Sequence, residues 1–157
     1  MKFSSNEDIE APIETVFRMY SDFEWFERAA LRRGADITRT DNLRGQGAGM
    51  TWQASFKFRG KARTVVGEVV DFSSPDSLAI DADSPNLKGM LSVEMVPLSR
   101  NRTRVAIALE LKPKSLTGRL MVQSLKLGKT RLTRQFKLKA AQFAKTQETR
   151  FKSGEFA

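Results

Sequence analysis

Apolar residues recur at helical spacing in two short segments near the N-terminus. A loosely alternating stretch at residues 3–10 favours a first strand. Four apolar residues then follow the i, i+3, i+4, i+7 spacing of one buried helical face: Ile13, Val16, Phe17 and Tyr20. Ser21 is followed three residues later by Glu24, which is a capping-box signature, and Gly34 lies where a helix would end. The pattern therefore predicts two short helices, the second of them capped by Ser21.

The apolar period shortens to about two between residues 35 and 112. The clearest example is residues 105–111, where every second residue is a large apolar one: Val105, Ile107, Leu109 and Leu111. Such alternation is typical of strands with one buried and one exposed face. Strands are predicted over 50–59, 62–72, 78–82, 91–95 and 105–111. Because the intervening turns are short, we expect these strands to pair antiparallel in chain order.

A single long helix is predicted to follow Pro113, with Ser115 or Thr117 as its cap. Its apolar stripe is wide enough for a helix that packs across the open face of the sheet. The stripe consists of Met121, Leu125, Gly128, Leu132, Phe136, Ala140 and Phe143. Four leucines lie on nearly the opposite side, and we expect them to pack under the short helices rather than to form a self-association surface: Leu116, Leu120, Leu127 and Leu138.

The predicted fold class is α+β. It consists of a curved antiparallel sheet of about six or seven strands, two short helices and one long C-terminal helix across the sheet. The apolar period stops near residue 147, so residues 1–147 are expected to form one domain and residues 148–157 a flexible tail. The N-terminal residues include no apolar run of signal-peptide length, and no segment approaches 18 apolar residues, so we expect a cytoplasmic protein.

This order of elements resembles the SRPBCC, or START-like, superfamily, whose fold is called the helix-grip. Its local marks are residues 9–17, 21–23, 47–49 and 75–78, and the resemblance spans roughly residues 3–145. Bacterial members of this type are often described as polyketide cyclase or dehydrase-like. The resemblance implies a cavity between the sheet and the long helix that takes hydrophobic or lipid-like molecules, without fixing one activity.

Apolar residues on the inner strand faces and the long helix are the candidate walls of such a cavity. The alternative is that they fill an ordinary core, because large apolar side chains are buried by default. A small hydrophobic ligand is the expected partner, and no cofactor is expected. The candidate ligand-binding residues are Trp52, Ala54, Phe56, Leu91, Val93, Met95, Ile107, Leu109, Leu132 and Phe136.

The chain has no histidine and no cysteine. Disulfides, thiolate chemistry and Ser-His or Cys-His nucleophiles are therefore excluded. Glu68 is the only weak catalytic candidate, since it lies between Val66 and Val70 and would have a raised pKa if it pointed inward beside Arg63 or Arg104. Whether it points inward stays open. A carrier of a hydrophobic ligand is therefore preferred to a polyketide cyclase or dehydratase.

Two other patterns are judged not to be sites. The acidic residues Asp71, Asp76, Asp81 and Asp83 lack the spacing of a cation-binding loop, so no metal site is expected. The glycine-rich segment 44–49 precedes a strand rather than a helix, which favours a turn over a phosphate-binding loop.

Positive charge is concentrated at the C-terminal end of the chain. The formal net charge is +9, and residues 112–157 contain 12 basic and 2 acidic side chains. This asymmetry permits peripheral contact with an anionic membrane or with nucleic acid, and the alternative is a solvated helix face. Arg119, Lys126 and Lys137 are expected to cluster on one flank of the helix, with Arg134 nearby.

Overall fold

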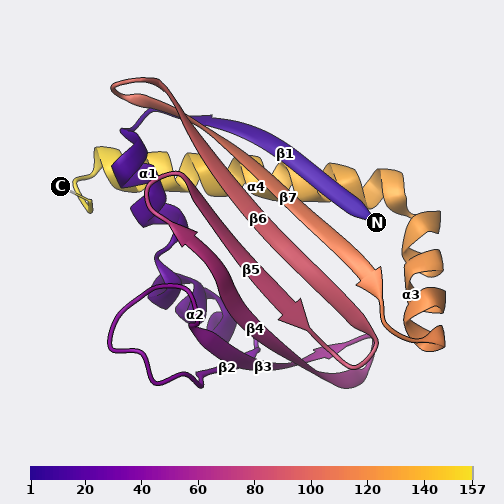
Figure 1. The fold of residues 1–157 in the computed structure, drawn as a ribbon. Coiled ribbons are helices and arrows are strands. Elements are labelled where there is room, and N and C mark those ends of the chain that lie inside the picture. Colours follow the sequence, from indigo (N-terminus) through magenta and orange to yellow (C-terminus); the bar gives the residue numbers. More distant parts are fainter. Residues whose placement is uncertain (157) are drawn as a thin grey trace.

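A computed structural model describes residues 1–156, which form one sheet with four helices (Figure 1). The seven strands are all antiparallel to their neighbours, in the order β1-β7-β6-β5-β4-β3-β2. The predicted meander is confirmed for β3 to β7, and β1 joins the edge formed by β7. The strands are β1 (Lys2–Ile9), β2 (Asp36–Arg39), β3 (Thr51–Phe58), β4 (Lys61–Ser73), β5 (Ser77–Asp83), β6 (Leu87–Ser99) and β7 (Arg102–Pro113).

The helices lie against one face of the curved sheet, so the predicted α+β fold class is confirmed (Figure 1). The two predicted short helices are α1 and α2, and the longest helix, α4, crosses the sheet. The predicted C-terminal helix, however, is divided at Gly128 into two helices that run in different directions (Figure 1). The helices are α1 (Ile13–Tyr20), α2 (Phe23–Arg32), α3 (Leu116–Leu127) and α4 (Lys129–Lys152).

Contacts at the start of α3 explain why the C-terminal segment bends. Ser115 caps α3, accepting a 3.0 Å hydrogen bond from the Gly118 amide and donating a 2.8 Å bond to Asn86 Oδ1. The amide of Lys114 donates to the Asn86 carbonyl at 2.8 Å. These contacts bind α3 to the turn between β5 and β6. The chain must then change direction to cross the sheet, and it does so at Gly128, because glycine is a poor helix former.

The N-terminus of α2 differs by one residue from the prediction. Asp22, not Ser21, is the cap, and its Oδ1 accepts from the Trp25 amide at 3.4 Å. The Ser21 hydroxyl instead donates to the Phe17 carbonyl at 2.7 Å, at the end of α1. The predicted end of the helix at Gly34 is confirmed, since this glycine has a φ of 89°.

Residues 148–157 were expected to form a flexible tail, and Arg150 within them contacts the rest of the chain. Helix α4 continues to Lys152, and Phe151 packs against the core. The Arg150 guanidinium bonds to Asp22 Oδ2 at 3.2 Å and to Glu155 Oε2 at 2.6 Å. These contacts supply the stabilisation that the apolar period does not predict at this end of the helix. Position 157 lies outside the described residues.

The core lies between the inner face of the sheet and the helices. Val16 and Met19 of α1 are fully buried against inward-facing residues such as Met50, Val69 and Val105. Among the residues that the structure describes, no helix has the length and apolar character needed to cross a membrane.

Candidate functional site

A cavity of about 520 Å³ lies between the inner face of the sheet, α2 and α4. Its walls are mainly aliphatic and aromatic side chains, and the inner faces of β3 to β7 form its floor. Six of the predicted cavity residues line it: Trp52, Ala54, Leu91, Val93, Ile107 and Phe136. Strand alternation, which sends every second side chain inward, predicted the five strand positions, and the helical period predicted Phe136.

The other four predicted residues lie elsewhere. Phe56 lines a second cavity, and Met95 is buried in the core. Leu109 and Leu132 are half-buried and line neither of the two cavities. The division of the C-terminal helix at Gly128 changes what its first turns contact, which periodicity alone does not reveal.

The two short helices supply cavity walls that the apolar pattern did not predict. Phe23 and Phe26 of α2 and Tyr20 of α1 line the cavity, with Phe143 of α4 close to them. The Tyr20 and Phe143 rings meet edge to face with their centroids 4.9 Å apart. The sequence showed that these side chains belong to apolar helix faces, but not that the two helices lie over the same end of the sheet.

Gly67 leaves space in the floor of the cavity. It lies on the inner face of β4 between Val65 and Val69, and it is paired with Trp52 of β3. A β-carbon at position 67 would be 4.0 Å from the nearest atoms, among them the Trp52 ring, so there is room for a side chain. A glycine within a strand is a signal for such space that the sequence already contained.

Few polar groups reach this cavity. Glu27 Oε1 accepts a 2.8 Å hydrogen bond from Trp52 Nε1, which fixes the indole ring in the wall. Tyr20 is buried, and its hydroxyl has no hydrogen-bond partner among the described residues. Burial raises the pKa of Tyr20, and the nearby charge of Glu7 raises it further by a smaller amount. The hydroxyl therefore stays protonated and can donate a hydrogen bond. Lys139 lies at the cavity's exposed edge.

A second cavity of about 480 Å³ lies under α3. Met121 and Leu125 cover it from the helix side, and two arginines, Arg59 and Arg63, also line it. The Arg63 Nε atom is buried and has no hydrogen-bond partner among the described residues. Val65 lines both cavities, so the two spaces are neighbours along the sheet.

Glu68 is exposed on the outer face of the sheet, where it pairs with Thr51 and Asp81 in the strand register. Val65, Gly67 and Val69 occupy the inner face of the same strand, so alternation sends Glu68 outward. Glu68, the weak catalytic candidate, therefore does not line the cavity. Neither proposed partner neutralises it: Arg63 lines the second cavity, and Arg104 Nε binds Asp8 Oδ1 at 2.8 Å.

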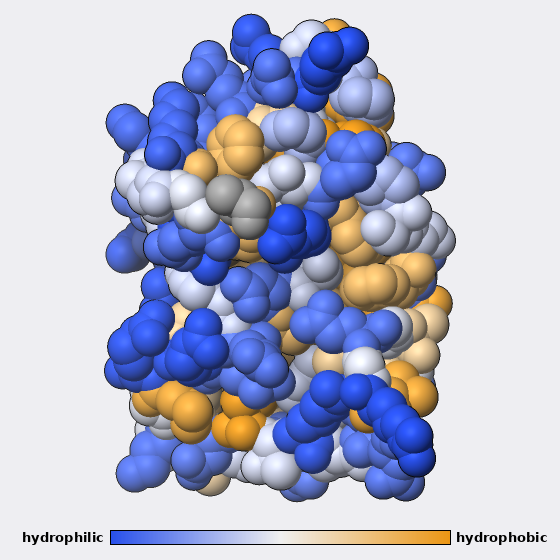
Figure 2. Space-filling view, turned by 90° about the vertical axis from the view of Figure 1, so that its left-hand side faces the viewer, coloured by the Kyte–Doolittle hydropathy of each residue, from blue (hydrophilic) through white to orange (hydrophobic). Residues whose placement is uncertain are grey.

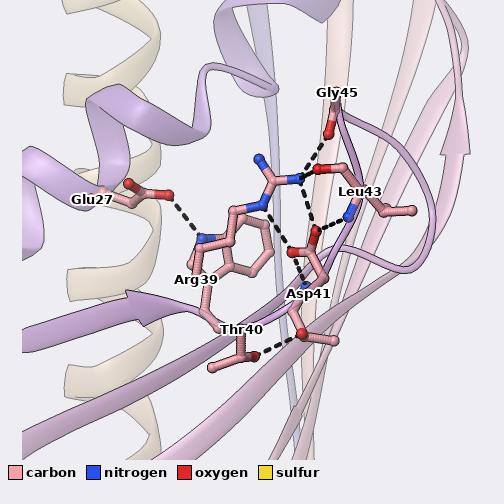
Figure 3. A network of polar contacts seen from close by, with 8 residues as sticks. Glu27, Arg39, Thr40, Asp41, Leu43 and Gly45 are labelled. Carbon is pink, nitrogen blue, oxygen red and sulfur yellow. Dashed lines mark hydrogen bonds and ion pairs between the residues drawn. The ribbon is translucent and has the colours of Figure 1, made fainter.

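A hydrogen-bond network between the end of β2 and the start of β3 holds the glycine-rich loop (Figure 3). Arg39 and Asp41 form two bonds, from Nε to Oδ2 at 2.8 Å and from Nη2 to Oδ1 at 2.9 Å. Arg39 Nη2 also donates to the Gly45 carbonyl at 2.7 Å, and Asp41 accepts from the amides of Leu43 and Thr51. The Arg39 guanidinium, with these amides, holds the pKa of Asp41 well below its usual range. These hydrogen bonds hold the loop as a turn between β2 and β3.

The predicted basic residues are all exposed but lie on two helices. Arg119 and Lys126 belong to α3, whereas Arg134 and Lys137 belong to α4 beyond the bend. They do not form one continuous flank. Within residues 1–156, no three acidic side chains lie close enough together to hold a metal ion.

Solved structures with the same arrangement share little sequence with this chain. An aromatase/cyclase from a Streptomyces species has a TM-score of 0.64 at 12% identity, covering 96% of this chain and 95% of that one. A Thermus thermophilus protein has a TM-score of 0.63 at 14% identity, covering 96% of both chains. A START superfamily protein from Mycobacterium smegmatis has a TM-score of 0.56 at 15% identity, covering 85% of this chain and 95% of that one.

The chain has the helix-grip fold. The likeness to START superfamily and aromatase/cyclase structures agrees with the resemblance to SRPBCC proteins and concerns the fold alone. No protein-family model and no curated protein matches the sequence. In this helix-grip protein, the side chains of the site itself are therefore what indicate its role.

Proposed function

We propose that this helix-grip protein binds a small hydrophobic ligand in the cavity between the sheet, α2 and α4. The observation that carries the proposal is the cavity itself, whose volume of about 520 Å³ lies in the range of small-molecule sites. Apart from Tyr20, Glu27 and Lys139, its walls are apolar or glycine. Such walls favour a ligand with a mostly apolar surface.

The same side chains favour binding over catalysis. The chain has neither histidine nor cysteine, and Glu68 lies outside the cavity. Glu27 is already hydrogen-bonded to Trp52, and the protonated Tyr20 hydroxyl is a hydrogen-bond donor rather than a base. The aromatase/cyclase activity named for the Streptomyces protein therefore has no evident acid–base pair to support it in this chain.

The ligand we infer is an apolar molecule with one hydrogen-bond acceptor. Phe23 and Trp52 lie with ring centroids 5.1 Å apart, and Phe26 stacks on Phe143 at 5.4 Å, so flat ring faces and edges form much of the wall. Tyr20 supplies the unpaired donor, which would otherwise stay unsatisfied at a cost of about 1–3 kcal/mol. A carbonyl or ether oxygen would satisfy it.

Filling the cavity from its floor tests the proposal. Gly67→Leu places a side chain in the cavity beside Trp52, and Gly45→Leu is the matched control, because Gly45 lies in an exposed loop with no atom within 4 Å of an added β-carbon. Binding of the neutral apolar dye Nile red is measured by its fluorescence. We expect saturable binding to the parent protein and to Gly45→Leu, and at least about tenfold weaker binding to Gly67→Leu.

Circular dichroism shows whether each variant keeps its fold, and quenching of the fluorescence of the two tryptophans, Trp25 and Trp52, shows whether the dye binds near them. If the parent protein takes up no apolar probe, or if folded Gly67→Leu binds it as well as the parent does, the proposed cavity is not the binding site.

A cytoplasmic location stays a prediction from the sequence.

A further inference from the structure

Helix α3 has two apolar sides. Its inner side is engaged by the fold, because Val122 is buried and Met121 and Leu125 cover the second cavity. Its outer side carries a row of three leucines whose exposed fractions are 74%, 59% and 92%: Leu116, Leu120 and Leu127. At 100° per residue these positions fall within about 40° of one another around the helix axis.

The row of leucines is not covered by the rest of the fold. We expected it to pack under the short helices, but α1 and α2 lie at the other side of the molecule, and α3 stands at an edge (Figure 1). By contrast, the side of the molecule at the C-terminal end of α4 is mostly hydrophilic, with hydrophobic side chains in small separate groups (Figure 2). A row of large exposed apolar residues on one helix is typical of an interaction surface.

The charged side chains of α3, and of α4 as far as residue 147, are all positive. Arg119 and Lys126 of α3 and Lys129 at the start of α4 are exposed, and within residues 1–156 none of them forms an ion pair. The sequence has no acidic residue between Glu110 and Glu148. The surface therefore combines apolar side chains with unpaired cations.

We propose that the outer face of α3 docks on an anionic lipid bilayer, with Leu116, Leu120 and Leu127 in the interfacial region. Arg119, Lys126 and Lys129 would then contact lipid phosphates and carboxylates. This combination of an apolar row and flanking cations is the pattern of interfacial amphipathic helices. A second copy of the chain is a poorer partner, because a two-fold contact would bring the same cations of both copies together.

Docking would place the second cavity next to the membrane, since α3 forms its outer cover through Met121 and Leu125. An apolar ligand could then pass between lipid and protein with little exposure to water. Docking of α3 needs no ligand in either cavity. Membrane binding can therefore be absent while the protein binds the dye, and dye binding can be absent while the protein binds membranes.

Flotation with lipid vesicles tests the proposal. The probes are vesicles of phosphatidylcholine alone and vesicles that also contain phosphatidylserine. We expect the parent protein to float with the anionic vesicles only, and added salt to weaken binding. Leu127→Ser should lower binding about tenfold, whereas Leu31→Ser, which changes an exposed leucine of α2, should leave it unchanged.

Reversal of the positive charges beside the leucine row is the second test. The double variant Lys126→Glu with Lys129→Glu should abolish flotation. The double variant Lys57→Glu with Arg100→Glu changes the net charge equally at exposed positions of β3 and the β6–β7 turn, and it should retain flotation. Circular dichroism and thermal melting verify that the variants are folded.

Three results would overturn the proposal. The first is an absence of flotation by the folded parent protein. The second is equal loss of binding in the α3 variants and their controls, which would indicate net charge alone. The third is a concentration-dependent dimer in analytical ultracentrifugation that Leu127→Ser abolishes, because the leucines would then belong to an interface between copies.

Discussion

Gly118 of α3 lies directly against the backbone carbonyl of Asn86, in the turn between β5 and β6. A β-carbon at position 118 would overlap this oxygen, which belongs to the backbone and has little freedom to move. The contact, together with the Ser115 cap, determines where α3 lies on the sheet. The second cavity therefore depends on it, because α3 is that cavity's cover.

Substitution of Gly118 by alanine should destabilise the protein by about 1–3 kcal/mol, since the turn or the helix must move to relieve the overlap. Gly128→Ala is the matched control: a β-carbon there would approach nothing closer than 4.0 Å. Urea denaturation followed by circular dichroism measures both changes. Equal stability of Gly118→Ala and the parent would show that α3 is not held against Asn86.

Arg150 should contribute strongly to stability, because its side chain is largely buried and connects α4 to Asp22 at the start of α2. It also lies over the Trp25 and Phe156 rings, at 5.4 and 4.7 Å from their centroids. Arg150→Ala should lower the free energy of unfolding by about 2 kcal/mol and shift the melting temperature accordingly. Lys145→Ala, an exposed change on the same helix, should have little effect. If the C-terminal residues formed a flexible tail, both substitutions would change the free energy of unfolding equally little.

Asp41 should make the stability pH-dependent in acid. Its bonds to Arg39 hold its pKa well below the ordinary Asp value, so the folded state favours the carboxylate. This contribution is complete above the ordinary pKa of about 4 and is lost as the pH falls toward the lowered value. Asp41→Asn should therefore melt at a lower temperature at neutral pH and show a weaker decline below pH 4. Asp36→Asn, at an exposed position in β2, should keep the parental decline. Parallel melting curves for Asp41→Asn and the parent across this range would contradict the assignment.

Arg63 should be replaceable without loss of stability. Its Nε atom is buried and unpaired in the structure, and a partly buried cation without partners incurs a desolvation cost. Arg63→Met keeps the length of the side chain and should leave the unfolding free energy equal or raise it by about 1 kcal/mol. The exposed Lys57→Met serves as the control. A loss larger than that of the control would indicate that the guanidinium has a stabilising partner in solution.

The sequence predicted most of the sheet because alternation alone identifies a strand with one buried face. It could not orient β4, where Val65, Val66, Val69 and Val70 place valine on both faces. The register also shifts between Val69 and Asp71, which interrupts the period. The orientation of Glu68 therefore required the strand pairing.

The bend at Gly128 was equally hidden, because the apolar stripe continues through it with an unbroken helical period. The bend follows from contacts between distant residues, chiefly those of α3 with Asn86, and such contacts leave no local pattern. The leucines at 116, 120 and 127 were expected to be covered for the same reason: helical spacing identifies a shared face, but it does not identify what lies opposite that face.

Val65 forms part of the wall of both cavities, so the two spaces share one aliphatic side chain of β4. Valine has few rotamers in a strand, and this shared part of the wall is therefore stiff. A bulkier residue at position 65 would consequently narrow both spaces at once.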